Sequence, residues 1–81
     1  MKIKLYGAQW CHFCIKEKEF LEEKKVKFEY IDVQKDLKSA NYIVKETGQT
    51  GIPVTEIIED GKSEFIVGFD EEYIKKRLKI K

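Results

Sequence analysis

The sequence predicts an α/β fold in the order β-α-β-α-β-β-α, with a four-stranded mixed sheet flanked by three helices. Three observations predict it. Short alternating runs, rich in side chains that favour strands, recur along the chain. Residues 11–25 lie between the first two runs and contain neither glycine nor proline, which favours a helix and hence a parallel, right-handed βαβ unit. Asp60-Gly61 separates the last two runs and predicts an antiparallel hairpin.

The first half of the chain is expected to form strand, helix and strand in turn. Ile3 and Leu5 alternate with their neighbours until Gly7 ends the run, which predicts a short strand. Residues 11–25 follow as a helix dominated by Glu and Lys, as an exposed helix surface requires. Residues 26–33 alternate again and predict the second strand. Three residues fall on one side of this helix at helical spacing, with Cys14 close by: Phe13, Phe20 and Leu21.

The second half is expected to form a helix, a hairpin and a last helix. A helix is predicted from about residue 36 to 47, and Gly48 is a fitting stop. Strands are predicted at 54–59 and 63–67, on either side of the hairpin turn. The last helix, about 70–78, begins with acidic and ends with basic residues, an order that complements its dipole. The inward residues expected in the first of these helices are Leu37, Ala40, Ile43 and Val44.

Length and composition indicate one domain, residues 1–81, because so short a chain cannot hold two cores. Charged residues make up 38% of the chain, yet the net charge is only +1, which points to neither nucleic acid nor a membrane surface. The N-terminus is too short and too polar for a secretory signal, and no apolar run approaches membrane-spanning length. We expect a cytoplasmic protein, and a monomer.

Cys11 and Cys14 are the only two cysteines, three residues apart at the start of the predicted helix. In a reducing cytosol such a pair is more often catalytic or metal-binding than structural. The positive end of a helix favours a thiolate, which is the attacking species in disulfide exchange. We expect Cys11, the first helical residue or its cap, to attack a substrate disulfide, and Cys14, one turn deeper, to resolve the mixed disulfide. Two buried apolar cysteines without chemistry are the alternative.

Three residues beside the cysteines have more than one interpretation. His12, if protonated, would stabilise the Cys11 thiolate and make the couple more oxidising; a solvent-exposed histidine of little effect is the alternative. Trp10 is either a buried aromatic of the core or rim or a contact platform, and burial is favoured. Phe13 is expected to pack or to contact the partner.

Pro53 is the only proline and is expected to open the third strand, where no ladder N–H is needed. Beside a cysteine pair we predict that the Ile52-Pro53 peptide bond is cis. The backbone N–H and C=O of Ile52 would then be free to pair with a docked extended peptide. The alternative is an ordinary trans proline that merely starts the strand.

These motifs together resemble the thioredoxin superfamily, and within it the glutaredoxin and glutaredoxin-like redoxin branch. The resemblance implies the thioredoxin fold, a cis proline facing the cysteines, and thiol-disulfide oxidoreductase activity. It covers essentially the whole chain through four stretches: Leu5-Tyr6, Trp10-Cys11-His12-Phe13-Cys14, Thr50-Gly51-Ile52-Pro53-Val54 and Val67-Gly68-Phe69-Asp70.

The chain departs from the glutaredoxin pattern at three places. Between the cysteines, His12 and Phe13 replace the usual proline and tyrosine. Ala8 stands where glutaredoxins often place a lysine that meets a glutathione carboxylate. Gly68-Phe69 replaces a Gly-Gly pair and looks more like redoxins that serve ribonucleotide reductase and are recharged by thioredoxin reductase. The resemblance implies that glutathione, if bound, contacts the Ile52 backbone, Gly68, Phe69 and Asp70. The residues that we expect to contact substrate or glutathione are Trp10, His12, Phe13, Ile52, Pro53, Gly68, Phe69 and Asp70.

The expected function is a dithiol oxidoreductase that reduces protein or glutathione mixed disulfides through Cys11 and Cys14. Its expected partners are disulfide-containing proteins, with glutathione or thioredoxin reductase as electron donor and no bound cofactor. A metal or iron–sulfur carrier of the same fold, using Cys11 with ligands from glutathione or a second chain, is the alternative. A closed zinc site is not expected, because it needs four ligands and His12 is badly placed to share one metal with both cysteines. A non-catalytic interaction module is the third possibility.

Overall fold

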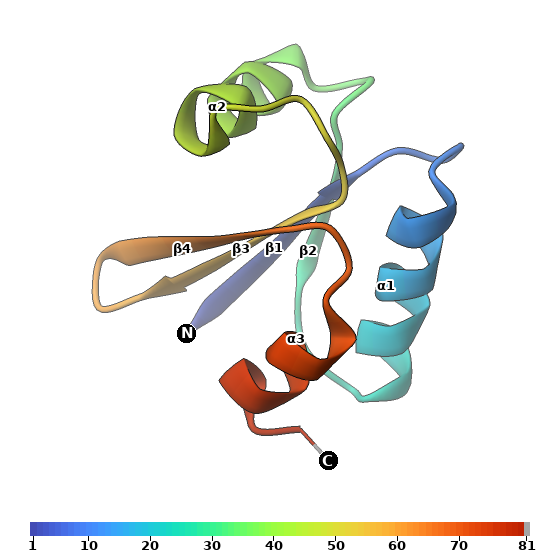
Figure 1. Ribbon diagram of the computed structural model, residues 1–81, viewed down its shortest axis with the longest axis vertical. Helices are drawn as coiled ribbons and strands as arrows, with labels where there is room; N and C mark the ends of the chain where they lie inside the picture. The colour runs from blue at the N-terminus through green and yellow to red at the C-terminus, as the bar shows by residue number, and fades with distance from the viewer. Residues whose placement is uncertain (81) are drawn as a thin grey trace.

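Seven elements follow one another in the predicted order in the computed structural model, which describes residues 1–80 (Figure 1). The strands form one sheet in the order β2-β1-β3-β4. Strand β1 runs parallel to β2 and antiparallel to β3, and β3 and β4 form the antiparallel hairpin, so the mixed four-stranded sheet is confirmed. The elements are β1 (Lys2–Gly7), α1 (His12–Glu23), β2 (Glu29–Asp32), α2 (Leu37–Thr47), β3 (Val54–Glu59), β4 (Lys62–Val67) and α3 (Glu71–Leu78).

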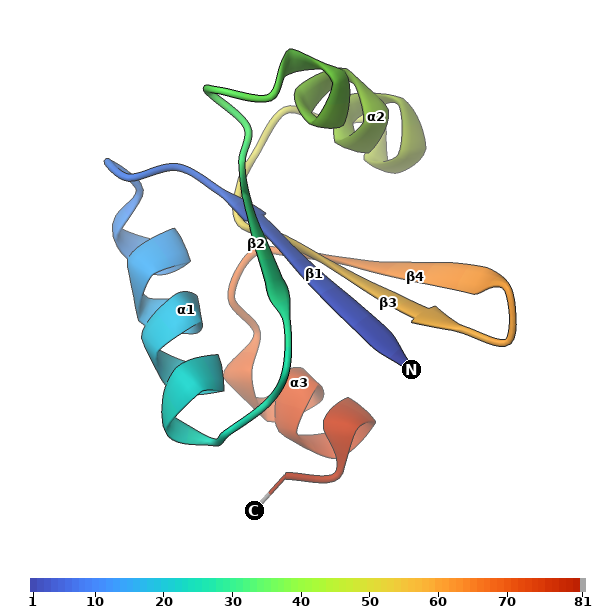
Figure 2. The same ribbon diagram turned by 180° about the vertical axis from the view of Figure 1, so that it is seen from behind.

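Helices cover both faces of the sheet. Helices α1 and α3 lie on one face and α2 lies on the other, as the two opposite views show (Figure 1, Figure 2). Burying one large apolar side chain stabilises a fold by about 1.5–3 kcal/mol, so each cluster makes a substantial contribution. The cluster beneath α1 and α3 consists of Ile3, Leu5, Leu21, Ile57, Ile66 and Ile74. The smaller cluster beneath α2 consists of Tyr6, Ile43 and Val54.

Strand β2 begins at Glu29, later than predicted, because the end of α1 uses the residues just before it. The N–H of Lys25 donates to the Glu22 carbonyl at 3.0 Å, and Lys25 has a left-handed φ of 59°. The N–H of Val26 donates to the Leu21 carbonyl at 2.9 Å. These two bonds form a Schellman motif that closes the helix. The predicted helix end at Lys25 and strand start at Val26 are therefore wrong.

Helix α2 turns only part of the predicted side toward the sheet, and Ala40 is half-buried on it as expected. Leu37 is 69% exposed and Val44 is exposed as well, so their predicted inward positions are wrong. Ile43 is buried as predicted, and Thr47 lies half-buried on the same side, its hydroxyl donating to the Ile43 carbonyl at 2.6 Å. Ser39 is also half-buried. The helix is rotated toward small polar residues, which can face the protein because their hydroxyls find partners locally.

The helices share one way of beginning. Asp36 caps α2 by accepting the N–H of Ser39 at 3.1 Å, and Asp70 caps α3 by accepting the N–H of Tyr73 at 3.1 Å. Each aspartate satisfies a backbone donor that the helix itself leaves free. At α1 the capping position is held by Cys11. A sulfur atom therefore occupies the place that a carboxylate takes in the other two helices.

Candidate active site

Cys11 is the N-cap of α1, which settles the expectation that it is the first helical residue or its cap. The backbone N–H of Cys14 donates to Cys11 Sγ at 3.3 Å. Free N–H groups and the helix dipole make this end of a helix favourable for negative charge. An anionic sulfur is thus favoured at this position, and the thiolate is the nucleophilic form of cysteine.

Cys14 is fully buried one turn deeper, against the end of β1. Gly7 makes the close approach possible, because a Cβ there would lie 2.9 Å from Cys14 Cβ and 3.0 Å from Cys14 Sγ. Burial, together with the hydrogen bond to Cys11, raises the pKa of the Cys14 thiol to about 12. Both cysteines are free, and Cys14 is a neutral thiol at pH 7.

The loop before β3 brings Ile52 and Pro53 to the cysteines. Ile52 packs against Cys11, and its carbonyl oxygen lies 4.0 Å from Cys11 Sγ in a long S–H···O contact. The Ile52-Pro53 bond is cis, as predicted. The Pro53 carbonyl accepts the N–H of Gly68 at 2.7 Å, which holds the loop before α3 at the same place. The loops before α1, β3 and α3 therefore meet around Cys11.

Aromatic side chains at the start of α1 are exposed. Trp10 is 68% exposed, so its expected burial in the core or rim is wrong; it lies in a turn, whose direction helical periodicity does not determine. Phe13 is 58% exposed, so it does not share the covered side of Phe20 and Leu21, and of its two expected roles packing in the core is wrong. Phe20, further along the helix, is covered by Phe69, with ring centroids 5.6 Å apart. Phe13 lies nearer the helix start, where its aromatic neighbour is the exposed ring of His12 at 5.8 Å.

Two residues that the resemblance places around glutathione have contacts within the fold. Phe69 packs against Phe20, and Asp70 is occupied as the cap of α3. Ala8, at the position where glutaredoxins often carry a lysine, is fully buried in a small cluster with Cys11 and Cys14. The contact of Phe69 with Phe20 joins the start of α3 to α1.

Glu17 also lies in this region, although no motif in the sequence pointed to it. Its side chain is 0% exposed, one turn after Cys14. The Thr55 hydroxyl donates to Glu17 Oε2, while the buried Oε1 has no hydrogen-bond partner within residues 1–80. Burial raises the pKa of Glu17 to about 7, against the lowering effect of Thr55. A signal was available, since Glu17 lies three residues after Cys14 and four before Leu21, the spacing of a buried helix side.

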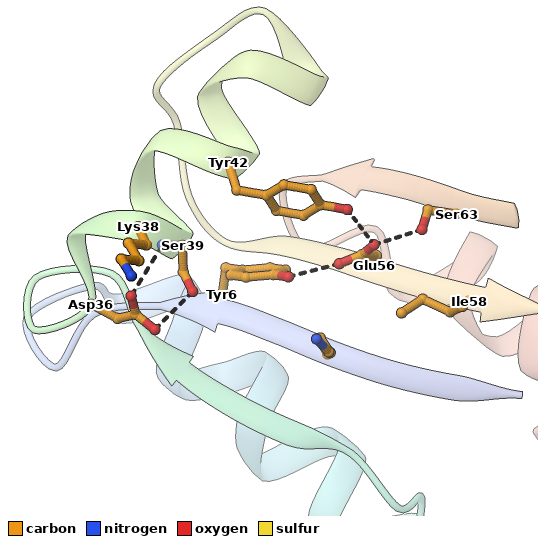
Figure 3. A pocket seen from close by; sticks show the side chains of 9 residues that line it. Tyr6, Asp36, Lys38, Ser39, Tyr42, Glu56, Ile58 and Ser63 are labelled. Atoms are coloured by element: carbon orange, nitrogen blue, oxygen red, sulfur yellow. Dashed lines mark hydrogen bonds between the residues drawn. The ribbon is translucent and has the colours of Figure 1, made fainter. Parts of the chain in front are cut away.

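The opposite face of the sheet carries a hollow of about 490 Å³ beside α2 (Figure 3). Glu56 lies in it and accepts hydrogen bonds from Tyr6 at 2.7 Å, Tyr42 at 2.7 Å and Ser63 at 2.6 Å. Neither cysteine lines this hollow.

Among residues 1–80, no three histidine, cysteine or acidic side chains are grouped to hold a metal ion. Over the same residues, no helix has the length and apolar character needed to cross a membrane.

Comparisons with known proteins agree with this geometry. The family model for Glutaredoxin matches residues 3–63. An uncharacterised glutaredoxin-like protein of the rubredoxin operon of Clostridium pasteurianum is 36% identical over 76 residues, which cover 94% of this chain and 96% of that protein. The crystal structure of a thioredoxin-like protein is 31% identical with a TM-score of 0.85, over 99% of this chain and 97% of that one. The glutaredoxin-like NrdH-redoxin from Escherichia coli is 26% identical with a TM-score of 0.78, over 94% and 93%. The predicted thioredoxin fold is confirmed.

Proposed function

Because this chain belongs to the glutaredoxin family of thiol redox proteins, we propose that it is a dithiol thiol-disulfide oxidoreductase that reduces protein or glutathione mixed disulfides. The observation that carries the proposal is the hydrogen bond from the Cys14 N–H to Cys11 Sγ at the N-cap of α1. It supports a reactive sulfur with a second thiol one turn away, the pair of groups that disulfide exchange requires. In this proposal a single-domain monomer acts in the cytoplasm without a bound cofactor.

The first step belongs to Cys11. Its thiolate attacks one sulfur of the substrate disulfide, and the substrate's S–S bond breaks as a new bond to Cys11 Sγ forms. The other substrate sulfur leaves with the electron pair as a thiolate. The Cys14 N–H stabilises the attacking charge before the bond forms.

The second step belongs to Cys14. Its sulfur, once deprotonated, attacks Cys11 Sγ and displaces the remaining substrate sulfur as a thiolate. The substrate is thereby reduced by two electrons, and Cys11 and Cys14 are oxidised to a disulfide. Two electrons and two protons from a thiol donor restore the pair.

The exposed side chains at the start of α1 form the proposed contact surface for a partner protein: Trp10, His12 and Phe13. Exposed aromatic rings give a partner apolar surface to cover. An extended substrate segment would pair with the backbone of Ile52 beside Pro53, like an added strand. The Ile52 N–H supports this role, because it donates no hydrogen bond within residues 1–80.

Glutathione and a thioredoxin reductase are the two proposed electron donors, and three observations favour the reductase. Buried Ala8 offers no cation to a glutathione carboxylate, and Asp70 Oδ1 is already bonded to the Tyr73 N–H. The similar NrdH-redoxin from Escherichia coli is described as having a thioredoxin-like activity profile. We expect faster turnover with thioredoxin reductase than with glutathione and its reductase when both are assayed side by side. The reverse order would assign glutathione as the donor.

Serine variants test the roles of the cysteines. Cys14→Ser should accumulate a mixed disulfide between Cys11 and the substrate, seen as an adduct by intact mass, because no second thiol can release it. Cys11→Ser should form no adduct and lose turnover. Turnover that persists in Cys11→Ser, or free product release by Cys14→Ser, would refute the proposed roles. No observation on residues 1–80 favours the alternative of metal or iron–sulfur carriage.

A further inference from the structure

Glu17 is an acidic residue on a helix side that otherwise faces the protein interior. It is fully buried, as are Cys14 and Leu21 on the same side of α1. Burying an ionised carboxylate is unfavourable unless a cation or several hydrogen bonds compensate. Burial and the Thr55 hydroxyl account for its shifted pKa, and no lysine or arginine contributes. Packing alone would favour an apolar residue here, so the carboxyl group calls for a chemical explanation.

One oxygen of this carboxyl group is free to bind a proton. The Thr55 hydroxyl from β3 donates to Oε2, and Oε1 has no partner within residues 1–80. An ionised carboxyl group can accept about four hydrogen bonds, so this one is far from satisfied. With a pKa of about 7, Glu17 exchanges a proton readily near neutral pH.

Cys14 needs such a partner. It must lose a proton before it attacks, since the thiolate is the nucleophile, yet burial raises its pKa to about 12. Glu17 lies three residues further along α1, where side chains are neighbours, and its charge raises the Cys14 pKa further. Tyr30 on β2 also lies close, but burial raises its pKa above the ordinary 10, so at neutral pH it cannot act as a base.

The surrounding elements supply no competing base. Besides Glu17 and Tyr30, Cys11 on α1 is the other titratable group that acts on Cys14. Strand β3 contributes the uncharged hydroxyl of Thr55. Strand β1 and helix α3 bring apolar side chains to this layer, among them Leu5 and Ile74.

We propose that Glu17 exchanges the proton of Cys14 during the resolving step, directly or through one water molecule, an inference that rests on the proposed function. The Cys14 thiol gives its proton to the Glu17 carboxylate. The Cys14 thiolate then attacks Cys11 Sγ of the mixed disulfide, a Cys11–Cys14 bond forms, and the substrate sulfur leaves as a thiolate. When a donor thiolate later attacks Cys11 Sγ, Cys14 leaves as a thiolate and takes the proton back from Glu17. Glu17 thus does not touch the substrate; it acts through Cys14, by holding the proton of the Cys14 thiol between the two steps.

The test separates the two chemical steps in wild type and Glu17→Gln, which keeps an oxygen for Thr55 but cannot take up the proton. Release of the first substrate thiol reports attack by Cys11, and release of the second reports resolution by Cys14. Both rates are measured in single turnovers from pH 5.5 to 9. In wild type the second rate should rise with pH through an inflection near 7. In Glu17→Gln that inflection should disappear and the second rate at pH 7 should fall about tenfold or more, while the first rate stays unchanged.

Glu56→Gln is the matched control, because Glu56 is the other buried glutamate and lies on the opposite face of the sheet. It should leave the pH profile of both steps unchanged. Equal second rates in wild type and Glu17→Gln would overturn the inference, as would a wild-type profile without an inflection near 7, which decides the matter even if Glu17→Gln does not fold. Failure of the first thiol release in wild type would instead overturn the proposed function.

Discussion

Thr55 and Glu56 are neighbours on β3, and their side chains point to opposite faces of the sheet. Each face holds one buried carboxyl group: Glu56 itself on one, and Glu17, which is bonded to Thr55, on the other. On the α2 face, Glu56 is 2% exposed and accepts hydrogen bonds from three hydroxyl groups (Figure 3). On the α1 face, fully buried Glu17 accepts one, from Thr55. The same functional group thus has two different environments: Glu56 borders a hollow and has three donors, and Glu17 is enclosed and has one.

The difference shows that the depth of burial and the number of hydrogen-bond donors together decide the charge of a carboxyl group inside a protein. Burial raises the pKa of Glu56, but the hydrogen bonds from Ser63, Tyr6 and Tyr42, with the charge of Lys4, together hold it below its usual range. For Glu17 a single donor does not offset burial, and the pKa rises to about 7. Glu56 is therefore an anion at neutral pH, and its hydrogen bonds join β3 to β1, α2 and β4. Glu17 is left able to change its charge beside the cysteines.

Removing the Glu56 side chain should have the largest effect on stability. Glu56→Ala leaves the buried Tyr6 hydroxyl without its acceptor, and a bond of this kind to a charged group contributes about 1.5–3 kcal/mol. It also removes the bonds from Tyr42 and Ser63, which contribute less because both residues are exposed and water can replace them. We expect the free energy of unfolding in urea at pH 7 to fall by about 3–5 kcal/mol. Glu46 is an exposed acidic residue on α2, so Glu46→Ala is the control. It should change the free energy of unfolding by less than about 0.5 kcal/mol. A loss no larger than that of the control would mean that the three bonds do not stabilise the fold.

Glu17→Gln should change how stability depends on pH. A carboxyl group whose pKa rises on folding, here from 4.5 to about 7, stabilises the fold fully below pH 4.5, and this contribution is lost as the pH rises through 7. The loss corresponds to about 3 kcal/mol. Stability measured from pH 4.5 to 8 should therefore fall in wild type relative to Glu17→Gln, which lacks the titrating group. Parallel stability curves for the two proteins would contradict the raised pKa.

Thr55→Val should widen the difference between the pKa values of Glu17 and Glu56. Valine keeps the shape of threonine but removes the one donor to Glu17, so the pKa of Glu17 should rise further. We expect a loss of about 1–2 kcal/mol in the free energy of unfolding at pH 8, where Glu17 is charged. The inflection in the resolving step should also move to higher pH in rapid-mixing experiments. An inflection that stays in place would show that Thr55 does not tune the carboxyl group.

Ser63→Ala should have the smallest effect. It removes one of three donors to Glu56, and Ser63 is exposed, so water can take its place. We expect a loss of about 0.5 kcal/mol in thermal or urea unfolding, with Glu56 still ionised at neutral pH. A loss as large as that of Glu56→Ala would mean that Ser63 alone holds the charge.

Much of the fold was predictable because local signals agreed with one another. Strand β3 spans the predicted residues, and the hairpin turn lies at the predicted pair. Cys11 caps α1, and the Ile52-Pro53 bond is cis. Each of these follows from a residue type with a strong preference for one place in a fold. Proline is confined to the start or edge of a strand, and a polar side chain before a helix caps it.

The predictions that failed depend on what lies across from a residue, which spacing alone does not reveal. The sequence made no prediction for Tyr6, because alternation in β1 separates it from Leu5 without saying which element covers it; it is buried beneath α2. Leu37 is exposed because α2 turns a more polar side toward the sheet. The direction of Trp10 is set by a turn. Glu17 has the helical spacing of a buried residue, but a charged side chain is not expected to be buried. Its hydrogen-bond donor, Thr55, lies on β3 and is not evident from the sequence around Glu17.

Because Cys11 Sγ caps α1, a change in the redox state of Cys11 should change how well the first turn of this helix is ordered. Once Cys11 Sγ is bonded to another sulfur it carries no charge, and its hold on the Cys14 amide weakens. The first turn of α1 should then fray more readily, and the Cys14 amide should exchange its hydrogen with solvent faster in the oxidised protein. The aspartate caps of α2 and α3 take no part in the chemistry, so the Ser39 and Tyr73 amides are internal standards. Amide exchange at one residue would thus report the redox state of the whole molecule.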